Sequence, residues 1–403
     1  MKKYLQTAAV GIVVIFSVII ASLPAAEGAP VRLGIDTIDE HLQLFAGKRV
    51  GLITNQTGVN SKLESTVDVL YEKTNLTAIF SPEHGLRGQV EAGASVGTGM
   101  DSKTGLPVYS LYGDTKKPTP AMLQNIDILC FDMQDIGTRF YTYMSTMALA
   151  MESAKENNIQ FVVLDRPNPI GGTVVEGPVL KAGLESFIGM YPIPIRHGLT
   201  IGELALLMND HFGIGCNLQV IKMKEWQRKM HWQDTGLHWV MTSPNIPTPD
   251  SALVYPGTGL IGATNISEGV GTTRPFELIG ASWLNGQAVA ERLNQANLPG
   301  VHFRPVGFTP RFGEHSGVGQ NGVQIHITDR YVYQSVRTAA MVLAVMRQFS
   351  PDRFAYDSER LFDIHIGESD LRLGIAPLTD LMDRWQREAT LFQSQSRQFY
   401  LYP

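Results

Sequence analysis

A polar cluster directly follows a short apolar run in the first quarter of the chain. The run Leu76–Phe80 has the composition of a buried strand, and it leads into Glu83, His84 and Arg87 among glycines. In open α/β sheets, ligands bind outside the carboxyl ends of the strands. A carboxyl group held there is suited to general acid catalysis, which makes Glu83 the first catalytic candidate. The alternative is a structural carboxylate that pairs with Arg87 or caps a helix.

Two further apolar runs lead into polar side chains in the same way. One ends near Asp132 and the other near Asp165. Because the carboxyl ends of parallel strands meet at one edge of a sheet, we expect all three polar groups to form one site around Glu83. Asp135 is a second catalytic candidate. The substrate-binding candidates from the three runs are His84, Arg87, Asp132, Gln134, Asp165, Arg166 and Asn168.

The segment that follows Asp135 adds aromatic and cationic groups. Tyr141 and Tyr143 offer apolar faces on which a sugar ring can stack, and Arg139 can bind an anion. Arg166 is the other candidate for binding a carboxylate, because it also stands at a predicted strand end. The alternative for the tyrosines is the beginning of a helix packed on the sheet.

A glycine-rich segment later in the chain, Thr264–Glu277, is the predicted second wall of the site. Glu268 and Glu277 flank Arg274 in this segment. Either glutamate is a candidate for the carboxylate that acts with Glu83; Glu268 is assigned a catalytic role, and Arg274 and Glu277 substrate-binding roles. An ordinary ion pair with Arg274 is the open alternative. Ligand sites favour interfaces between domains, which is why this segment is placed opposite the strand ends.

The elements that must position these residues alternate between strand and helix patterns. From Val50 to Met223, short apolar runs alternate with helical segments, which predicts an α/β fold with a mainly parallel sheet covered on both faces. The segment Ser243–Asp250 contains three prolines and is predicted to be irregular, so the domain boundary is placed there or just after it. We expect one domain over residues 30–252 and a smaller α+β domain over residues 253–403, with a cleft between them.

Motifs for cofactors and metals are weak in this sequence. Gly257–Gly262 matches the dinucleotide fingerprint, but it follows the proline-rich segment and is expected to lead into a loop, where the fingerprint requires a helix. Gly93–Gly97 matches the nucleophile pattern of serine hydrolases without a strand before it or a helix after it. His84 has no histidine or cysteine partner at ligand spacing. We expect neither a metal nor a cofactor.

The beginning of the chain has the three parts of a secretory signal. Two lysines precede an uncharged apolar run, which small residues follow. We interpret residues 1–26 as a signal peptide, with an uncleaved membrane anchor as the alternative, and expect a secreted or periplasmic protein. The 403 residues carry a net charge of −5 that is spread along the chain, which argues against nucleic acid as a partner. Cys130 and Cys216 are expected to be free thiols.

Six segments spread over nearly the whole chain carry a family resemblance. They are Leu52–Gly58, Ser81–Gly88, Phe131–Tyr143, Asp165–Gly172, Ser243–Thr248 and Glu268–Glu277. These segments resemble the exo-β-N-acetylmuramidase family of bacterial glycoside hydrolases, long catalogued as a domain of unknown function. Blocks of this length and specificity are not expected by coincidence.

The resemblance implies a Rossmann-like first domain, a smaller second domain and a cleft between them. The implied activity is release of β-linked N-acetylmuramic acid from the non-reducing end of peptidoglycan fragments, in cell-wall turnover and recycling. The family's catalytic glutamate falls on Glu83, and Asn245 joins the substrate-binding candidates. The partners would be peptidoglycan-derived saccharides with a terminal N-acetylmuramic acid, whose lactyl carboxylate suits the arginines of the predicted site.

The mechanism and two other functions stay open at the level of sequence. A second carboxylate roughly 5 Å from Glu83 would predict retention of anomeric configuration, and a separation of roughly 6.5 to 9.5 Å would predict inversion. Participation of the substrate's acetamido group, oriented by Asp132 or Asp135, would need no protein nucleophile. A non-catalytic extracytoplasmic binding protein for muropeptides or sugars is the main functional alternative. An amidase or esterase is disfavoured because it needs a metal or an activated nucleophile.

Overall fold

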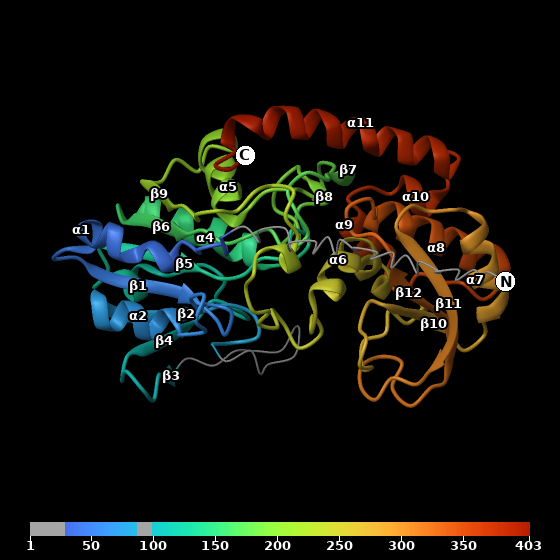
Figure 1. Cartoon of the computed structure of the whole chain (residues 1–403), viewed down its shortest axis with the longest axis horizontal. Coiled ribbons are helices and arrows are strands. Elements are labelled where there is room, and N and C mark those ends of the chain that lie inside the picture. The colour runs from blue at the N-terminus through green and yellow to red at the C-terminus, as the bar shows by residue number, and fades with distance from the viewer. Residues whose placement is uncertain (1–28, 87–98) are drawn as a thin grey trace, which may run out of the picture.

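The computed structural model describes residues 29–86 and 99–403 as two lobes joined side by side. The first lobe holds a seven-stranded sheet, and the second lobe holds a smaller sheet with several helices (Figure 1). The long helix α11 (Leu378–Ser396) crosses over both lobes. The predicted signal peptide and Arg87 lie outside the described residues.

The seven-stranded sheet has the strand order of a Rossmann fold. The order is β3-β4-β2-β1-β5-β6-β9, and every strand except the edge strand β3 is parallel to its neighbours. Without β3, the parallel strands follow the doubly wound order 3-2-1-4-5-6 when they are counted along the chain. The strands are β1 (Arg49–Thr54), β2 (Asn75–Ser81), β3 (Gly99–Met100), β4 (Pro107–Ser110), β5 (Ile128–Asp132), β6 (Gln160–Leu164) and β9 (Leu218–Ile221).

Apolar side chains cover both faces of this sheet because its central strands are apolar at successive positions. In β5, Leu129 and Phe131 enter one core cluster and Cys130 enters the other. A strand that is buried on both faces needs this continuous apolar pattern, which is why the sequence could predict the fold. The helical elements of the lobe are η1 (Ile35–His41), α1 (Leu42–Phe45), α2 (Thr66–Lys73), α3 (Pro120–Leu123), α4 (Tyr143–Glu156), α5 (Ile201–Leu206), η2 (Leu207–His211) and η3 (Trp232–Asp234).

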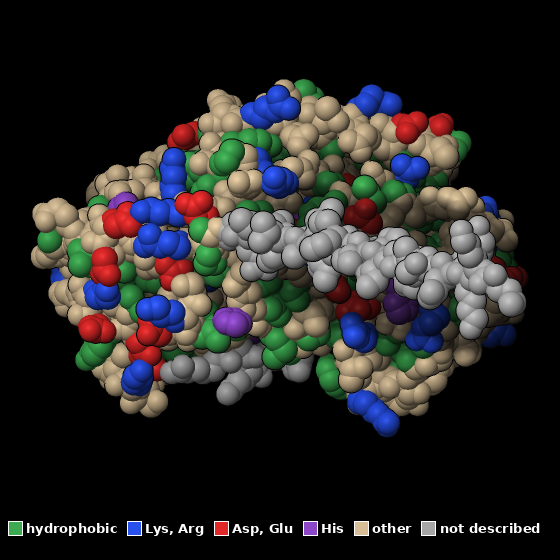
Figure 2. Space-filling view, viewed as in Figure 1, with side chains coloured by type: hydrophobic (Ala, Val, Ile, Leu, Met, Phe, Trp, Pro, Cys, Tyr) green, Lys and Arg blue, Asp and Glu red, His purple; other side chains and the backbone are tan. Residues whose placement is uncertain are grey.

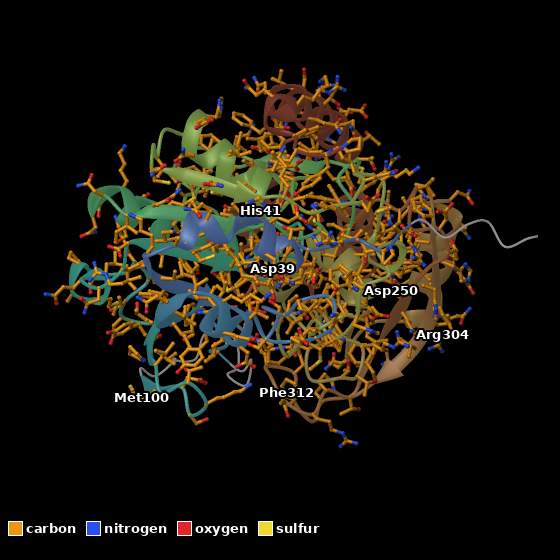
Figure 3. The ribbon with its side chains drawn as sticks, turned by 60° about the vertical axis from the view of Figure 1, so that its left-hand side comes forward. Asp39, His41, Met100, Asp250, Arg304 and Phe312 are labelled. Carbon is orange, nitrogen blue, oxygen red and sulfur yellow. The ribbon has the colours of Figure 1, made fainter. Side chains whose placement is uncertain are left out.

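The second lobe is built on an antiparallel sheet of three strands in the order β10-β12-β11. In the view of Figure 3, Asp250 at the beginning of α6 lies nearer to the first lobe than Arg304 on the outer strand β11. The elements are α6 (Pro249–Thr258), η4 (Gly259–Ala263), β10 (Leu278–Ala281), α7 (Gly286–Gln295), β11 (Val301–Phe308), β12 (Gln320–Ile327), α8 (Ser335–Phe349), α9 (Glu359–Ile366), α10 (Asp370–Leu373) and η5 (Arg397–Phe399), with α11 between the last two. A two-stranded antiparallel ribbon of β7 (Glu176–Val179) and β8 (Pro194–Arg196) belongs to the first half of the chain.

The proline-rich segment is irregular only in its first part. The side chain of Thr248 accepts a hydrogen bond from the backbone of Ser251, and Pro249 occupies the first turn of α6, where a proline needs no hydrogen-bond partner. Gly257–Gly262 itself is helical, in α6 and η4, and the chain leaves the helical state after Ala263, so the motif leads into irregular structure as expected. A side chain at Gly257 would meet the backbone oxygen of Ser335 at 2.0 Å, so this glycine permits close packing of α6 against α8.

The end of the chain returns to the first lobe. α11 packs against β7, and beyond η5 the Tyr402 hydroxyl donates to Oδ2 of Asp165 at 2.5 Å. The backbone nitrogen of Leu401 donates to Glu203 at 2.8 Å. The second lobe is thus connected to the first at both of its ends.

Two other expectations concern the chain as a whole. Cys130 and Cys216 are buried and unpaired, as predicted. In Figure 2, lysine and arginine side chains lie among acidic ones over the visible face of the first lobe. Within residues 29–86 and 99–403, no helix combines the length and apolarity needed to cross a bilayer.

Candidate active site

A cavity of about 200 Å³ contains Glu83 and is lined by residues of both halves of the chain. The first half contributes the end of β2, the segment before α4 and Phe187 with Ile188. The proline-rich segment, α6, Phe276 and the end of α9 complete the wall. The lining residues are Glu83, His84, Tyr112, Phe140, Tyr141, Thr142, Phe187, Ile188, Ser243, Asn245, Ile246, Tyr255, Phe276 and His365.

The turn after β2 aims Glu83 into this cavity. The backbone nitrogen of Gly85 donates to the oxygen of Pro82 at 3.1 Å, and His84 has a positive φ of 71°. That conformation is uncommon for a residue with a Cβ, and such strain is found mainly at functional sites. Glu83 is only 7% exposed, and the hydroxyl of Thr142 donates to its Oε2 at 2.7 Å. Thr142 precedes α4 but does not cap it, so its hydroxyl serves the carboxyl group instead.

Three tyrosines pack together beside Glu83. The ring centroids of Tyr141 and Tyr143 are 4.8 Å apart, and those of Tyr141 and Tyr255 are 6.0 Å apart. Tyr143 is fully buried and donates to the backbone oxygen of Thr242 at 2.5 Å, so it supports the wall and does not face a ligand. Tyr141 lines the cavity. Burial raises the pKa of Tyr255, and the negative charges of Glu83 and Glu268 raise it further, which places both carboxyl groups within electrostatic reach of one hydroxyl.

The predicted second wall divides into residues in the cavity and residues beside it. Phe276 lines the cavity with a positive φ of 67°, a second strained non-glycine residue at this site. Glu268 is half-buried, and burial raises the pKa of its carboxyl group, but its side chain does not belong to the cavity lining. Arg274 is half-exposed and donates to Oε2 of Glu277 at 3.1 Å, which is the ion pair weighed as the alternative. Burial raises the pKa of Glu277.

Asp132 and Arg166 form a buried ion pair at the point where the strand order reverses. Arg166 donates to Asp132 at 2.5 Å from Nε and at 2.8 Å from Nη2, and Thr66 donates to the same carboxylate. A doubly wound sheet usually binds its ligand at this crossover between β1 and β5. Here the adjoining hollow measures only about 10 Å³, which is no larger than one water molecule. The two side chains are thus paired with each other inside the protein, and their role in substrate binding stays a prediction.

Other strand-end candidates are also used inside the protein. Gln134 donates to the backbone oxygens of Asp135 and Pro167, both at 2.7 Å. Asp135 accepts from the backbone nitrogen of Gly137 at 2.7 Å, and Asn168 donates to the oxygen of Leu199 at 3.0 Å. None of these three candidates is part of the cavity lining. They shape the turns that carry the wall and do not reach the cavity themselves.

Asp165 supports the end of the chain and not a ligand. Its carboxylate accepts from the backbone nitrogen of Gly202 at 2.8 Å, from Thr200 at 2.8 Å and from Tyr402 at 2.5 Å. Burial raises its pKa to about 7, although the bond from Tyr402 opposes that rise. The side chain is fully buried and its bonds run to other parts of the protein, so it does not face the cavity.

Arg139 does not form the predicted anion clamp. Its guanidinium is fully buried and donates to the backbone oxygens of Pro178, Ile193 and His365 at 3.0, 2.9 and 2.7 Å. An arginine that is closed off in this way cannot touch a bound sugar.

The structure thus brings four of the predicted residues together: Glu83, His84, Tyr141 and Asn245 line one cavity. Sequence reasoning missed Thr142, Tyr255, Phe276 and His365. The position of Thr142 between two selected tyrosines was a usable signal, whereas Tyr255 and His365 lie in helices that show no sign of chemistry. Over the described parts of the chain, no three His, Cys, Asp or Glu side chains are grouped as metal ligands.

A larger hollow of about 410 Å³ lies among α8, α9, α10 and α11 in the second lobe. Its lining includes Phe354, Tyr356 and Phe362 and contains no carboxyl group. A site without an acid or a base cannot cleave a glycosidic bond by proton transfer. The smaller cavity holds the buried carboxyl group of Glu83 together with three of the other predicted site residues, and it is the candidate active site.

Comparison with known proteins agrees with this assignment. Residues 50–250 match the family described as "Exo-beta-N-acetylmuramidase NamZ, N-terminal", and residues 253–402 match its C-terminal counterpart. The peptidoglycan beta-N-acetylmuramidase NamZ of Bacillus subtilis (strain 168) is 50% identical over 383 residues, which are 94% of this chain and 92% of that relative.

Two solved structures have the same fold. Both are DUF1343 family proteins from Bacteroides fragilis NCTC 9343. The first is 42% identical with a TM-score of 0.87, covering 94% of this chain and 100% of that one. The second is 28% identical with a TM-score of 0.74, covering 93% and 99%. These likenesses confirm the predicted two-part α/β fold and the predicted family, and we conclude that the chain belongs to the exo-β-N-acetylmuramidase NamZ family.

Proposed function

We propose that this protein is a glycosidase that releases β-linked N-acetylmuramic acid from the non-reducing end of peptidoglycan fragments, with Glu83 as the general acid. The observation that carries the proposal is a buried carboxyl group, held by Thr142, inside a cavity of a chain that belongs to this family. The cavity volume of about 200 Å³ lies below the range of about 300–1,000 Å³ for sites that hold drug-sized ligands. A small cavity suits one terminal sugar better than an extended glycan.

In this mechanism, Glu83 protonates the glycosidic oxygen as the bond to the terminal sugar breaks. The hydrogen bond from Thr142 fixes the orientation of the carboxyl group. Once the proton has left, the hydroxyl of Thr142 and the N-terminus of the 14-residue helix α4 both favour the carboxylate charge. Tyr141 offers an aromatic face to the sugar ring.

Glu268 is our choice for the carboxyl group that acts with Glu83. The negative charge of each carboxyl group contributes to the raised pKa of Tyr255, and burial raises the pKa of Glu268 itself. Asp135 is not among the residues that line the cavity, so orientation of the substrate's acetamido group by Asp135 would have to be indirect.

We also propose that residues 1–26 direct the protein out of the cytoplasm. The support is the pattern of two lysines, an apolar run and small residues. A peptidoglycan substrate outside the cytoplasm is consistent with it. N-terminal sequencing of the protein from a secreting host should find a chain that begins near residue 27, and a full-length cytoplasmic protein would contradict it.

The test of the activity is hydrolysis of two disaccharides that differ only in order. The purified protein should release N-acetylmuramic acid from MurNAc-β-1,4-GlcNAc and leave GlcNAc-β-1,4-MurNAc intact. Glu83→Gln should slow release by about a thousandfold. Asp135→Asn, which changes a buried carboxylate outside the cavity, is the matched control that should retain it. Saturable binding of the first disaccharide without any turnover by the unmodified protein would overturn the proposal and favour a binding protein.

A further inference from the structure

Arg139 carries a buried positive charge that has no acidic partner among the described residues. Its hydrogen bonds run to three backbone oxygens, and its Nε has no protein partner. Burial lowers the pKa of its guanidinium to about 9, so the group remains protonated at neutral pH. Burying an ion without a counter-charge is costly, and proteins rarely do so without a reason.

The other buried arginines of the described chain show how unusual this arrangement is. Each of them is paired with a buried carboxylate, at distances between 2.5 and 3.2 Å. Arg139 is the only buried arginine of residues 29–86 and 99–403 that has no such ion pair. The pairs are Arg166 with Asp132, Arg196 with Glu176 and Arg228 with Glu203.

The unpaired charge lies directly behind the wall of the candidate active site. Arg139 precedes Phe140, which lines the cavity, and it donates to the backbone oxygen of His365, which also lines it. A Cβ at Gly189, next to the lining residue Ile188, would lie 3.6 Å from Nε of Arg139. Three segments of the wall therefore surround one guanidinium.

Glycine is required where the second lobe closes over this group. Gly367 has a φ of 95°, and a Cβ at that position would lie 2.7 Å from Nη2 of Arg139. The charge also acts on the wall itself: burial lowers the pKa of His365, and the positive charge of Arg139 contributes to the same shift. At neutral pH the imidazole of His365 is therefore uncharged, and it adds no charge of its own to that of Arg139 at this wall.

We propose that Arg139 makes the cavity selective for a sugar with an anionic substituent, acting through the wall and not by contact. The inference rests on the proposed function and deepens it, because it concerns how the site distinguishes a carboxylate-bearing terminal sugar from its neutral analogue. A charge in a low-dielectric interior is weakly screened, so its field extends into an adjacent cavity. A carboxylate in the cavity is stabilised by this field, and a neutral sugar of the same shape is not.

The test compares two substrates that differ only in charge. One is 4-nitrophenyl β-N-acetylmuramic acid, and the other is the same glycoside with its lactyl carboxylate converted to the carboxamide. For the unmodified protein, kcat/KM should favour the acid. Arg139→Met should lower the acid-to-amide ratio by about tenfold, which is the size expected of one charge at intermediate dielectric. Arg139→Lys, which keeps the charge, should leave the ratio within about threefold of the original.

The ratio distinguishes this role from a purely structural one. If Arg139 only ties segments together, Arg139→Met lowers kcat/KM equally for both substrates, and the inference is overturned. If the variants do not fold, the salt dependence of the unmodified protein still tests the inference. A buried charge is weakly screened, so the acid-to-amide ratio should persist between 20 mM and 500 mM salt. Loss of the ratio at high salt would overturn the inference and assign the selectivity to the exposed Arg274. Absence of turnover of either glycoside by the unmodified protein would instead count against the proposed function itself.

Discussion

The carboxyl ends of β1 and β5 differ from that of β2 in how their polar side chains are used. At the β1/β5 crossover, Asp132 and Arg166 are paired and leave room for no more than a water molecule. At the end of β2, Glu83 is also buried but faces a cavity of about 200 Å³. Both regions belong to one edge of one sheet.

The difference teaches that position at a strand end is not enough to identify a functional residue. A carboxylate whose lone pairs are satisfied by a fixed arginine contributes to stability, because removing either partner leaves a buried charge. A carboxyl group beside an open volume can meet a substrate. Side chains fill the space at the β1/β5 crossover, where a Rossmann fold usually binds its ligand. The candidate site lies instead at the end of β2, beside the second lobe.

The sharpest test of this contrast is Glu83→Gln with two leaving groups. General acid catalysis contributes about 10²–10⁴-fold, and a sugar leaving group needs the proton far more than 4-nitrophenolate does. We expect kcat on MurNAc-β-1,4-GlcNAc to fall by about a thousandfold and kcat on the 4-nitrophenyl glycoside to fall much less. Equal losses on both substrates would show that Glu83 acts in some other way.

Asp132→Asn should give the opposite result. The variant leaves Arg166 buried without its anion, so we expect the free energy of unfolding to fall by about 3 kcal/mol. Urea denaturation measures this quantity, and kcat of the folded fraction should change by less than about threefold. A stable but inactive variant would show that Asp132 takes part in catalysis, and the two strand ends would then not differ in function.

Thr142→Val tests how much the hydrogen bond from Thr142 contributes to catalysis by Glu83, and its expected effect is smaller than that of Glu83→Gln. The change keeps the shape but removes the hydroxyl that donates to Oε2. We expect kcat on the disaccharide to fall by about tenfold with little change in KM, since a charge-assisted hydrogen bond contributes about 1.5 to 3 kcal/mol at most. Thr142→Ser, the matched control, should restore most of the rate. An unchanged kcat in the valine variant would remove Thr142 from the mechanism.

The raised pKa of Asp165 predicts that this residue makes the stability of the protein, but not its catalysis, depend on pH. Burial raises its pKa from 3.8 to about 7, so between these values the folded protein holds a proton that the unfolded chain has released. The free energy of unfolding should therefore fall as the pH rises from about 4 to 7, by up to about 1.4 kcal/mol per pH unit. Comparison of the unmodified protein with Asp165→Asn isolates this slope. Identical slopes would mean that Asp165 is ionised in the folded state.

The sequence predicted the fold well because burial on both faces leaves a visible pattern. β1, β2, β5 and β6 are continuous apolar runs, and their helices fall between them. The helical state of Gly257–Gly262 was not predicted because glycine is a poor helix former, and Gly257 is needed here for close packing against α8, which sequence alone does not reveal.

The site was only partly predictable for a different reason. Glu83 could be found because a strand, a turn and a carboxyl group follow one another in sequence. Whether Arg139 or Asp165 faces a ligand or the interior depends on partners about 40 to 240 residues away, such as His365 and Tyr402. Tyr255 joins the site only through the packing of α6 against the first lobe.

The return of the chain end to the first lobe has a consequence for access to the site. The second lobe is anchored near Thr248, where α6 begins, and again where Tyr402 and Leu401 bond to Asp165 and Glu203. A part held at two separated points can turn only about the line that joins them, unless one of the two connections breaks. Any opening of the second lobe against the first is therefore restricted to this one axis. Breaking the bonds of Tyr402 and Leu401 would remove that restriction and leave the lobe held near Thr248 alone.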